Sequence, residues 1–267
     1  MKNVSPIGIF DSGVGGLSVL NQISYFLPFE NLIYVADSKF APYGPKSPED
    51  IRGRAFKIMN FLMAKHDIKL MVVACNTATA AAIKEMREKY SIPIVGMEPA
   101  IKPAIKASKE KRIGILATEG TLKSAKFSAL LEHYDGECMF YTQPCIGLVE
   151  LIEKGEINTP QIRELVYEYL APLKHHSVDV IVLGCTHYFY IKNIVEEYFN
   201  GLVKVIHTER AVAQHAYNVL KNNNLLNTKQ DKSPLIYSNS SSDVKKVVKT
   251  LMPNNKDQLL FSKNFKV

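Results

Sequence analysis

Two stretches of the sequence, "VVACNTATAA" at 72–81 and "VIVLGCTHYF" at 180–189, share one arrangement. In each, an apolar run that indicates a strand ends at a cysteine, Cys75 or Cys185, and a threonine follows within two residues. The two cysteines lie 110 residues apart, which is the length of one modest domain. The repetition predicts two similar domains that face each other, each with one thiol at the end of a strand.

Short apolar runs alternate with longer helical patterns along the rest of the chain. At 47–66, Ser47 is placed to cap a helix, Pro48 stands in its first turn, and Glu49 and Asp50 follow at its positive end. The strands are nearly continuous apolar runs, as expected when helices cover both faces of a sheet. The pattern predicts an α/β fold of two similar domains with mainly parallel sheets facing each other across a cleft. The predicted strands are "PIGIF", "NLIYVA", "IKLMVVA", "IPIVG", "KRIGILA", "ECMFYT", "VDVIVLG" and "LVKVI".

The chain is predicted to cross between the two domains twice. Pro99 and Pro103 punctuate it in "GMEPAIKPAI", and a return is expected near "HTERAVA". The first domain then comprises residues 1–98 plus 208–267, and the second comprises residues 99–207. The segments "SPLIYSNSSSDVKKVVKTL" and "DQLLF" are expected to rejoin the first domain.

Composition and motif counts narrow the function classes. No run of 18 or more apolar residues occurs and the N-terminal residues lack the pattern of a secretory signal, so we expect a cytoplasmic protein without membrane contact. The four cysteines form no CxxC pair, which predicts free thiols and weighs against a thiol oxidoreductase. The seven histidines form no HxxxH or HExxH motif, so we expect no metal site.

The formal net charge of +7 is concentrated in the C-terminal tail. From Lys221 onward the chain has nine lysines and three aspartates but no arginine or glutamate, a net charge of +6. Asparagines and serines dilute these lysines, whereas nucleic-acid platforms interleave basic residues with aromatic ones. We therefore expect a solvated surface and no nucleic-acid partner.

Two loops that follow predicted strands carry polar groups. Asp11 and Ser12 stand in "GIFDSGVGGLSV" at the carboxyl end of a strand, where ligands collect in open α/β sheets. The glycines there form neither a GxGxxG nor a P-loop motif, so a nucleotide site has little support, and Asp11 can instead cap the following helix. The loop "DSKFAPYG" at 37–44 offers exposed backbone amides that suit a carboxylate.

The two thiols are the strongest chemical signal. A cysteine that opens a helix feels the positive helix end, which predicts a pKa below the ordinary value of about 8.5 for each thiol. A packing role is the alternative for one such cysteine, but two in matching positions favour chemistry. Cys138 and Cys145 lack this context and are expected to be packing or surface residues. Inverting a stereocentre through a planar carbanion needs an acid and a base on opposite faces, and facing thiols can supply both.

Five motifs occur in this order over nearly the whole chain: "FDSGVGG", "APYG", "ACNTA", "ATEGT" and "LGCTHY". Together they resemble the cofactor-independent glutamate racemases of the aspartate/glutamate racemase family, which serve bacterial cell-wall synthesis. The resemblance implies two related α/β domains with the active site between them, a homodimer, glutamate as the small-molecule substrate, D-glutamate for peptidoglycan, and no cofactor. The alternatives are a racemase of aspartate or another amino acid, and a catalytically silent binding module.

The resemblance also implies roles for individual residues. Cys75 and Cys185 are the catalytic thiols, Cys185 taking the α-proton of L-glutamate and Cys75 that of D-glutamate. Asp11 is expected beside Cys75, and His187 with Glu153 beside Cys185, to relay protons and tune the thiols. The implied substrate-binding residues are Asp11, Ser12, Pro42, Tyr43, Gly44, Asn76, Thr77, Thr121 and Thr186.

Two stretches depart from the pattern of these racemases. In "VIHTERAVA", His207 stands where an aspartate is usual, and Glu209 where a small residue is common. His207 is expected to be a surface or hinge residue, with a role in tuning His187 as the alternative. "QPCIGLVE" lacks the proline that often follows its cysteine, so the helix that carries Glu153 can begin differently.

Overall fold

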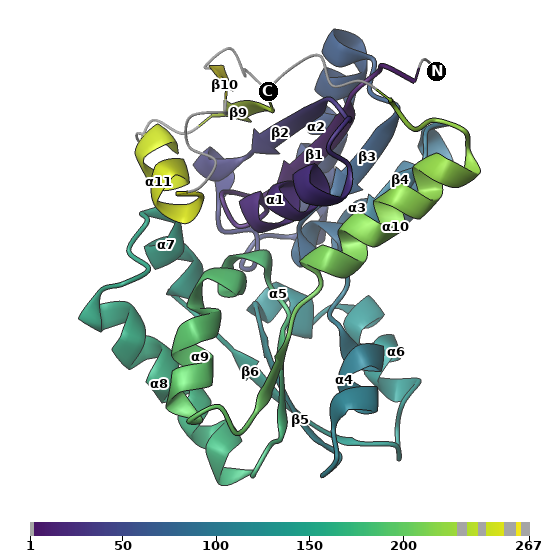
Figure 1. The fold of residues 1–267 in the computed structure, drawn as a ribbon. Coiled ribbons are helices and arrows are strands. Elements are labelled where there is room, and N and C mark those ends of the chain that lie inside the picture. The colour runs from purple at the N-terminus through teal and green to yellow at the C-terminus, as the bar shows by residue number, and fades with distance from the viewer. Residues whose placement is uncertain (1–2, 229–233, 240–243, 254–259, 263–267) are drawn as a thin grey trace.

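The computed structural model describes residues 3–228, 234–239, 244–253 and 260–262. These residues build two separate parallel sheets, the larger one uppermost in Figure 1 and the smaller one below it. Helices cover both faces of each sheet. The predicted fold class, two mainly parallel α/β units that face each other, is confirmed.

The larger sheet is parallel in every described pairing. Its strands are β1 (Ile7–Asp11), β2 (Leu32–Ala36), β3 (Leu70–Val73), β4 (Ile94–Gly96), β9 (Leu235–Ser238) and β10 (Leu260–Ser262), in the order β10-β9-β2-β1-β3-β4. Neighbouring residues of a strand point to opposite faces, so Ile9 joins one apolar core while Phe10 joins another. Both faces of β1, β2 and β3 are buried, which is why these central strands are almost wholly apolar.

Helices on the larger sheet pack in two layers (Figure 1). They are α1 (Leu17–Phe26), the 3-10 helix η1 (Ser38–Phe40), α2 (Pro48–His66), α3 (Asn76–Lys89), α10 (Glu209–Asn222) and α11 (Val244–Leu251). α1 packs against α10 over one face, and α2 packs against α3 over the other. The predicted start of α2 is confirmed, since the Ser47 hydroxyl accepts a hydrogen bond from the Asp50 N–H (3.1 Å) and Pro48 stands in the first turn.

The smaller sheet repeats this layered construction. Its strands are β5 (Arg112–Ala117), β6 (Met139–Pro144), β7 (Val180–Leu183) and β8 (Lys204–Ile206), in the order β6-β5-β7-β8. Its helices are α4 (Ile101–Ala107), α5 (Glu119–Leu122), α6 (Ala125–Glu132), α7 (Leu148–Glu153), α8 (Pro160–His175), the 3-10 helix η2 (Thr186–Ile191) and α9 (Lys192–Tyr198). Val180 packs with α4 and α6, while Ile181, the next residue of β7, packs with α8 and α9.

The chain passes between the two sheets twice. It leaves the larger sheet after β4 and returns between β8 and α10, and β9 then pairs with β2. The domain bounds at residues 98 and 208 stay a prediction. Parts of the expected "DQLLF" strand and of the basic tail, at 229–233, 240–243, 254–259 and 263–267, lie outside the described residues. Of the helices that the structure does describe, none is long and apolar enough to cross a membrane.

A buried ion pair closes the larger sheet at the amino ends of β2 and β3. Lys69 and Glu30 are buried and lie 2.6 Å apart. The Lys69 ammonium also donates to the carbonyl oxygen of Leu225 (2.7 Å), and Glu30 accepts a hydrogen bond from the Asn227 N–H (2.8 Å). The pair therefore ties the segment after α10 to the first half of the chain.

Candidate active site

The carboxyl ends of four strands, two from each sheet, meet between the sheets. β1 ends at Asp11 and β3 leads to Cys75, while β5 leads to Thr118 and β7 leads to Cys185. These ends are in contact, because the hydroxyl of Thr77, which follows Cys75, lies 3.0 Å from that of Thr118. A ligand bound here would touch both halves of the molecule.

Both cysteines precede a helix, but the two helices differ. Cys75 is the N-cap of α3, and its sulfur accepts a hydrogen bond from the Ala78 N–H (3.4 Å). Cys185 precedes the 3-10 helix η2, and α-helical structure begins only with α9. Both are free thiols, with 5% and 8% of their surface exposed.

A narrow cavity is lined by both thiols and by loops from both sheets. Asp11, Glu153 and Thr121 do not line it, but each hydrogen-bonds to a residue that does. Two of its lining residues, Thr118 and Val149, were not predicted. The predicted residues that line it are Ser12, Pro42, Tyr43, Gly44, Cys75, Asn76, Thr77, Cys185, Thr186 and His187.

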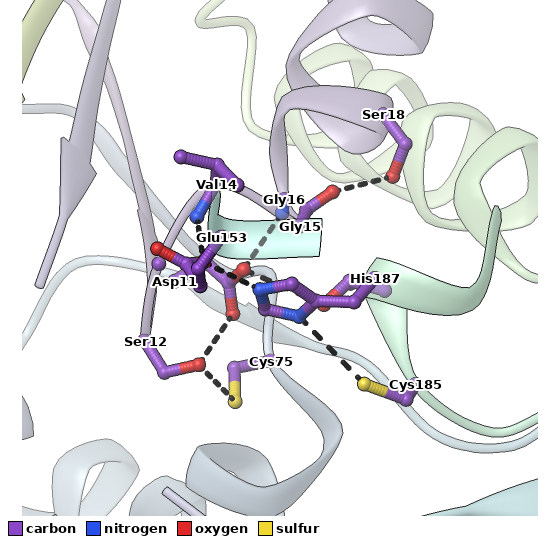
Figure 2. Close-up of polar contacts among 12 residues, drawn as sticks. Asp11, Ser12, Val14, Gly15, Gly16, Ser18, Cys75, Glu153, Cys185 and His187 are labelled. Carbon is purple, nitrogen blue, oxygen red and sulfur yellow. Dashed lines mark hydrogen bonds and ion pairs between the residues drawn. The ribbon is translucent and has the colours of Figure 1, made fainter. Parts of the chain in front are cut away.

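On the larger-sheet side, Cys75 reaches Asp11 through Ser12 rather than directly (Figure 2). The Cys75 thiol lies 3.8 Å from the Ser12 hydroxyl, which in turn donates to Asp11 Oδ1 (3.4 Å). Asp11 Oδ2 accepts hydrogen bonds from the Gly16 N–H (2.7 Å) and from the Thr186 hydroxyl (3.4 Å). Asp11 thus holds the turn that leads into α1 and also contacts the opposite sheet. The N-cap of α1 is Gly16, without a side-chain cap, so Asp11 is not the helix cap itself, and its role at the site stays a prediction.

On the smaller-sheet side, an imidazole and a carboxylate follow Cys185 in series (Figure 2). His187 Nδ1 lies 3.8 Å from the Cys185 sulfur, and His187 Nε2 lies 2.6 Å from Glu153 Oε1. The same carboxylate oxygen accepts a hydrogen bond from the Val14 N–H (2.6 Å), in the glycine loop of the larger sheet. Helix α7, which ends at Glu153, begins at Leu148 after Gly147.

Burial shifts the pKa of Cys75 in the direction opposite to the one expected. Desolvation raises the pKa of this thiol well above its ordinary value, and the nearby Asp11 carboxylate raises it further, while the Ala78 N–H lowers it only in part. The lowered pKa that the sequence predicts for Cys75 is therefore wrong, because a helix start stabilises a thiolate less than burial destabilises it.

Two further side chains of the site have shifted pKa values. Burial raises the pKa of Asp11, and the nearby His187 offsets this only in part. Burial lowers the pKa of His187, but hydrogen bonds to Cys185 and Glu153 outweigh this and hold it well above the ordinary value of 6.5. An imidazolium therefore stands beside Cys185 at neutral pH.

Uncharged polar groups complete the cavity. The hydroxyls of Thr77, Thr118 and Thr121 lie within 3.0 to 3.2 Å of one another and join α3 to α5 across the gap. Asn76 is 5% exposed, and neither polar atom of its side chain has a hydrogen-bond partner among the described residues. A buried amide without partners is costly, so it is suited to bind a polar ligand.

One comparison with known proteins decides the family. The sequence model of the Asp/Glu/hydantoin racemase family matches residues 15–216. The chain belongs to this racemase family. A glutamate racemase of Ectopseudomonas mendocina is 47% identical to it over 247 residues, covering 92% of this chain and 93% of that protein. One of Pseudomonas aeruginosa is 48% identical over 237 residues, covering 88% and 89%.

Solved structures of racemases share the fold. A glutamate racemase isoform of Bacillus anthracis superposes with a TM-score of 0.86 at 30% identity, covering 97% of this chain and 96% of that one. The Escherichia coli glutamate racemase, solved with L-glutamate and the activator UDP-MurNAc-ala, gives 0.83 at 29% identity, covering 96% and 97%. An aspartate racemase of Picrophilus torridus, with a TM-score of 0.53 at 18% identity over 81% and 93%, shares the fold alone.

His207 and Glu209, where the chain departs from the expected racemase pattern, pair with each other. His207 Nδ1 lies 2.5 Å from Glu209 Oε2, at the return crossing into α10. Glu209 is buried, and the His207 ring packs against Phe189. Neither residue lines the cavity, so the cavity lining does not support the alternative in which His207 tunes His187.

A buried polar network behind the Pro42–Gly44 loop was missed by sequence reasoning. The Tyr43 hydroxyl donates to Asp37 Oδ2 (2.5 Å), so it points away from the cavity that Tyr43 lines. Arg54 donates two further hydrogen bonds to Asp37 (2.7 and 2.8 Å). Asp37 directly follows β2, and Asp11 is the last residue of β1. The signal available in the sequence was that each aspartate stands at the end of a strand and precedes a serine.

Proposed function

We propose that this protein interconverts L- and D-glutamate by proton transfer between Cys75 and Cys185, without a cofactor. The observation that carries the proposal is that two buried free thiols, at matching positions on opposite sheets, line one cavity. The similarity to proteins named glutamate racemase supports glutamate as the substrate. Racemisation assays over a panel of amino acids, including aspartate, separate glutamate from the alternative substrates.

The chemistry requires a base on one face of Cα and an acid on the other. One thiolate removes the α-proton, a planar carbanion forms, and the opposite thiol delivers its own proton, so the two thiols exchange roles with each turnover. With each sulfur roughly 3 to 3.5 Å from Cα, the sulfurs stand about 6 to 7 Å apart, far beyond a disulfide bond of about 2 Å. Cys185 acts on L-glutamate and Cys75 on D-glutamate.

The polar residues behind each thiol have different tasks. The imidazolium of His187 places a positive charge 3.8 Å from the Cys185 sulfur, and Glu153 keeps that charge in place. Ser12 links the Cys75 thiol to Asp11, which has a raised pKa and can accept or return a proton. These groups tune the thiols and relay protons between turnovers.

The substrate is held by neutral donors around the cavity. Its carboxylates accept hydrogen bonds from hydroxyl groups, from the Asn76 amide and from backbone N–H groups of the loops that follow each cysteine. Pro42, Tyr43 and Gly44 contribute the wall and main chain of their loop. The proposed binding residues that line the cavity are Ser12, Pro42, Tyr43, Gly44, Asn76, Thr77 and Thr186, with Thr118 added from the structure. Asp11 and Thr121 are also proposed, through their hydrogen bonds to Ser12 and Thr77.

Circular dichroism of L-glutamate incubated with purified, cofactor-free protein tests the reaction. We expect the signal to decay to zero with wild-type protein and with Cys138→Ser, the control outside the cavity. Cys75→Ser and Cys185→Ser should abolish racemisation, because a hydroxyl is too weak an acid to replace either thiol. Absence of both racemisation and α-proton exchange with any amino acid would favour a binding module instead.

An analogue of glutamate with a leaving group on Cβ assigns each thiol to its enantiomer. Elimination needs only abstraction of the α-proton, so one thiol suffices. Cys75→Ser should process the L-analogue and Cys185→Ser the D-analogue. If both variants handled both enantiomers equally, a single mobile base would replace the two-thiol assignment.

The proposed setting is the cytoplasm, where D-glutamate supplies peptidoglycan synthesis. The protein is proposed to act as a homodimer without a nucleic-acid partner. Sedimentation equilibrium tests the homodimer, for which we expect a mass twice that of one chain. A single-chain mass at micromolar concentration would overturn it.

A further inference from the structure

Three glycines allow the two halves of the molecule to approach closely around the cavity. A methyl group built on Gly13 would overlap the Glu153 carboxylate, and one on Gly15 would overlap the His187 ring. One on Gly120 would lie 2.5 Å from the carbonyl oxygen of Gly44. The first two neighbours are side chains, whereas the third is main chain and cannot change rotamer.

Gly120 is not required by its own backbone conformation. It lies inside helix α5, and its φ is outside the left-handed region, so alanine would suit the same conformation and favour the helix. Only the contact with Gly44 explains the absence of a side chain. This contact lies at the cavity, because Gly44 and Thr118 both line it.

Both partners of this contact are held firmly. The Gly44 loop is anchored by buried Tyr43, whose hydroxyl is fixed by Asp37 and, through it, by Arg54. Gly120 stands between Thr118 and Thr121, whose hydroxyls bond to Thr77 on the opposite side. Neither side can yield without disturbing groups that line or support the cavity.

We propose that Gly120 is a positioning residue, which sets the separation of the two thiols through its main-chain contact with Gly44. The proposal rests on the proposed two-thiol racemisation. A methyl group at position 120 must push α5 away from the Gly44 loop, which moves Thr118 and Thr121 and widens the cavity between Cys75 and Cys185. A proton transfer that needs both sulfurs near one Cα suffers most from such widening.

Gly120→Ala, compared with Gly53→Ala, tests the proposal. Gly53 is exposed on α2 with open space where its Cβ would be. Gly53→Ala therefore controls for replacing a helical glycine by alanine without a steric clash. Racemisation by Gly120→Ala should fall roughly 100-fold, as expected for a misplacement of about 1 Å. Elimination from the L-analogue needs one thiol and should fall much less, so the ratio of racemisation to elimination should drop. Gly53→Ala should match the wild type in both.

A second readout does not depend on glutamate. Iodoacetamide should modify Cys75 and Cys185 faster in Gly120→Ala than in the wild type, with Cys138 as the internal reference in peptide mass mapping. If the wild type did not racemise glutamate but Gly120→Ala still sped up modification of Cys75 and Cys185, the positioning role would be supported and the proposed function rejected. If Gly120→Ala racemised glutamate like the wild type, with the same ratio of racemisation to elimination and the same rate of thiol modification, the positioning role alone would be rejected.

A milder variant guards against misfolding of Gly120→Ala. In Gly44→Ala the new methyl group would lie 3.2 Å from Thr118 Cβ, a tight but less severe contact. Modification of the two thiols should then accelerate to a smaller degree. Rates equal to those of the wild type in this variant, with Gly120→Ala unfolded, would count against the proposal.

Discussion

The two thiols have surroundings of different charge. Cys75 faces Ser12 and, behind it, the Asp11 carboxylate, while Cys185 faces the imidazole of His187. Because the pKa values of Cys75 and His187 are both raised, Cys75 keeps its proton at neutral pH and a positive charge stands beside Cys185. In the proposed reaction the two thiols therefore start from unequal surroundings, with a carboxylate behind Cys75 and a cation beside Cys185.

Glu153→Gln tests the carboxylate that holds His187. The change removes a negative charge 2.6 Å from His187 Nε2, so the pKa of His187 falls and the imidazolium is lost at a lower pH. Elimination from the L-analogue, which depends on Cys185, should fall about 100-fold at neutral pH. The alkaline limb of its pH profile should move to lower pH, while elimination from the D-analogue should change much less.

The elimination assay is needed because racemisation cannot reveal this asymmetry in kcat/KM. The enantiomers have equal free energy in water, so kcat/KM must fall by one factor in both directions. Glu150→Gln, an exposed change on the same helix, is the control and should leave both eliminations unchanged. Equal losses for the two analogues in Glu153→Gln would contradict the assignment of Glu153 and His187 to Cys185.

Asp11→Asn should stabilise the fold while it impairs the reaction. Burial raises the pKa of Asp11, so its ionised form lowers stability once the pH rises through the folded-state pKa. Asparagine can still accept the Gly16 N–H hydrogen bond without the charge. At pH 8 we expect a gain of about 1 kcal/mol, or roughly 2 to 4 °C in Tm, measured by thermal unfolding. The gain should vanish below about pH 4, where aspartic acid is also neutral in the unfolded chain. A gain that persists there would require another cause.

Sequence patterns located most residues of the candidate site but misjudged their electrostatics. Cys75 and Cys185 could be paired because each ends an apolar strand, and strand ends of parallel sheets gather at one edge. The pKa of Cys75 could not be predicted, since it depends on burial by the opposite sheet and on Asp11. Thr118 was missed because its contact with Thr77 joins elements that are distant in the sequence.

The segment from β2 to α2 is held together by the buried Asp37–Arg54 pair. Arg54 contributes two hydrogen bonds from the middle of α2, and Asp37 also accepts one from Tyr43. This pair connects the loop that lines the cavity to the body of the larger sheet. Its loss should therefore affect both the stability of the protein and the order of the Pro42–Gly44 loop.

Arg54→Met should cost about 3 to 5 kcal/mol of unfolding free energy, because it leaves the Asp37 carboxylate buried without its cation. Urea unfolding measures the change. Arg52→Met, two residues earlier on α2, removes exposed ion pairs with Glu49 and Glu85 and should cost at most about 1 kcal/mol. Similar losses for the two variants would show that the buried pair has no special role.

Elements were easier to predict than their ends. All eight quoted strands exist. The central strands β1, β2, β3 and β7 are buried apolar runs, whereas the edge strands β6 and β8 are exposed or half-buried. A helix was expected after Cys185, and residues 186–191 form the 3-10 helix η2, with α-helical structure only from Lys192. Buried Thr186 and His187 point to the reason, since their side chains are committed to contacts with Asp11, Cys185 and Glu153.

At the scale of the molecule, the basic tail should remain free of nucleic acid. Binding dominated by phosphate contacts weakens steeply as the salt concentration rises. The tail has a net charge of +6 with polar residues between its lysines, so it should bind a random DNA duplex poorly. Fluorescence anisotropy with a labelled duplex should give no saturable binding at physiological ionic strength. Tight binding that salt abolishes would mean that the tail is a nucleic-acid surface.

The return of the chain to its first sheet has a consequence for synthesis on the ribosome. All strands of the smaller sheet leave the exit tunnel before β9 does, so that sheet can close while the larger one is still incomplete. Until β9 arrives, β2 is an open edge, and until residue 225 arrives, Lys69 lacks one of its carbonyl partners. A nascent chain that stalls in this interval presents an unpaired strand to its neighbours, which is the usual start of aggregation.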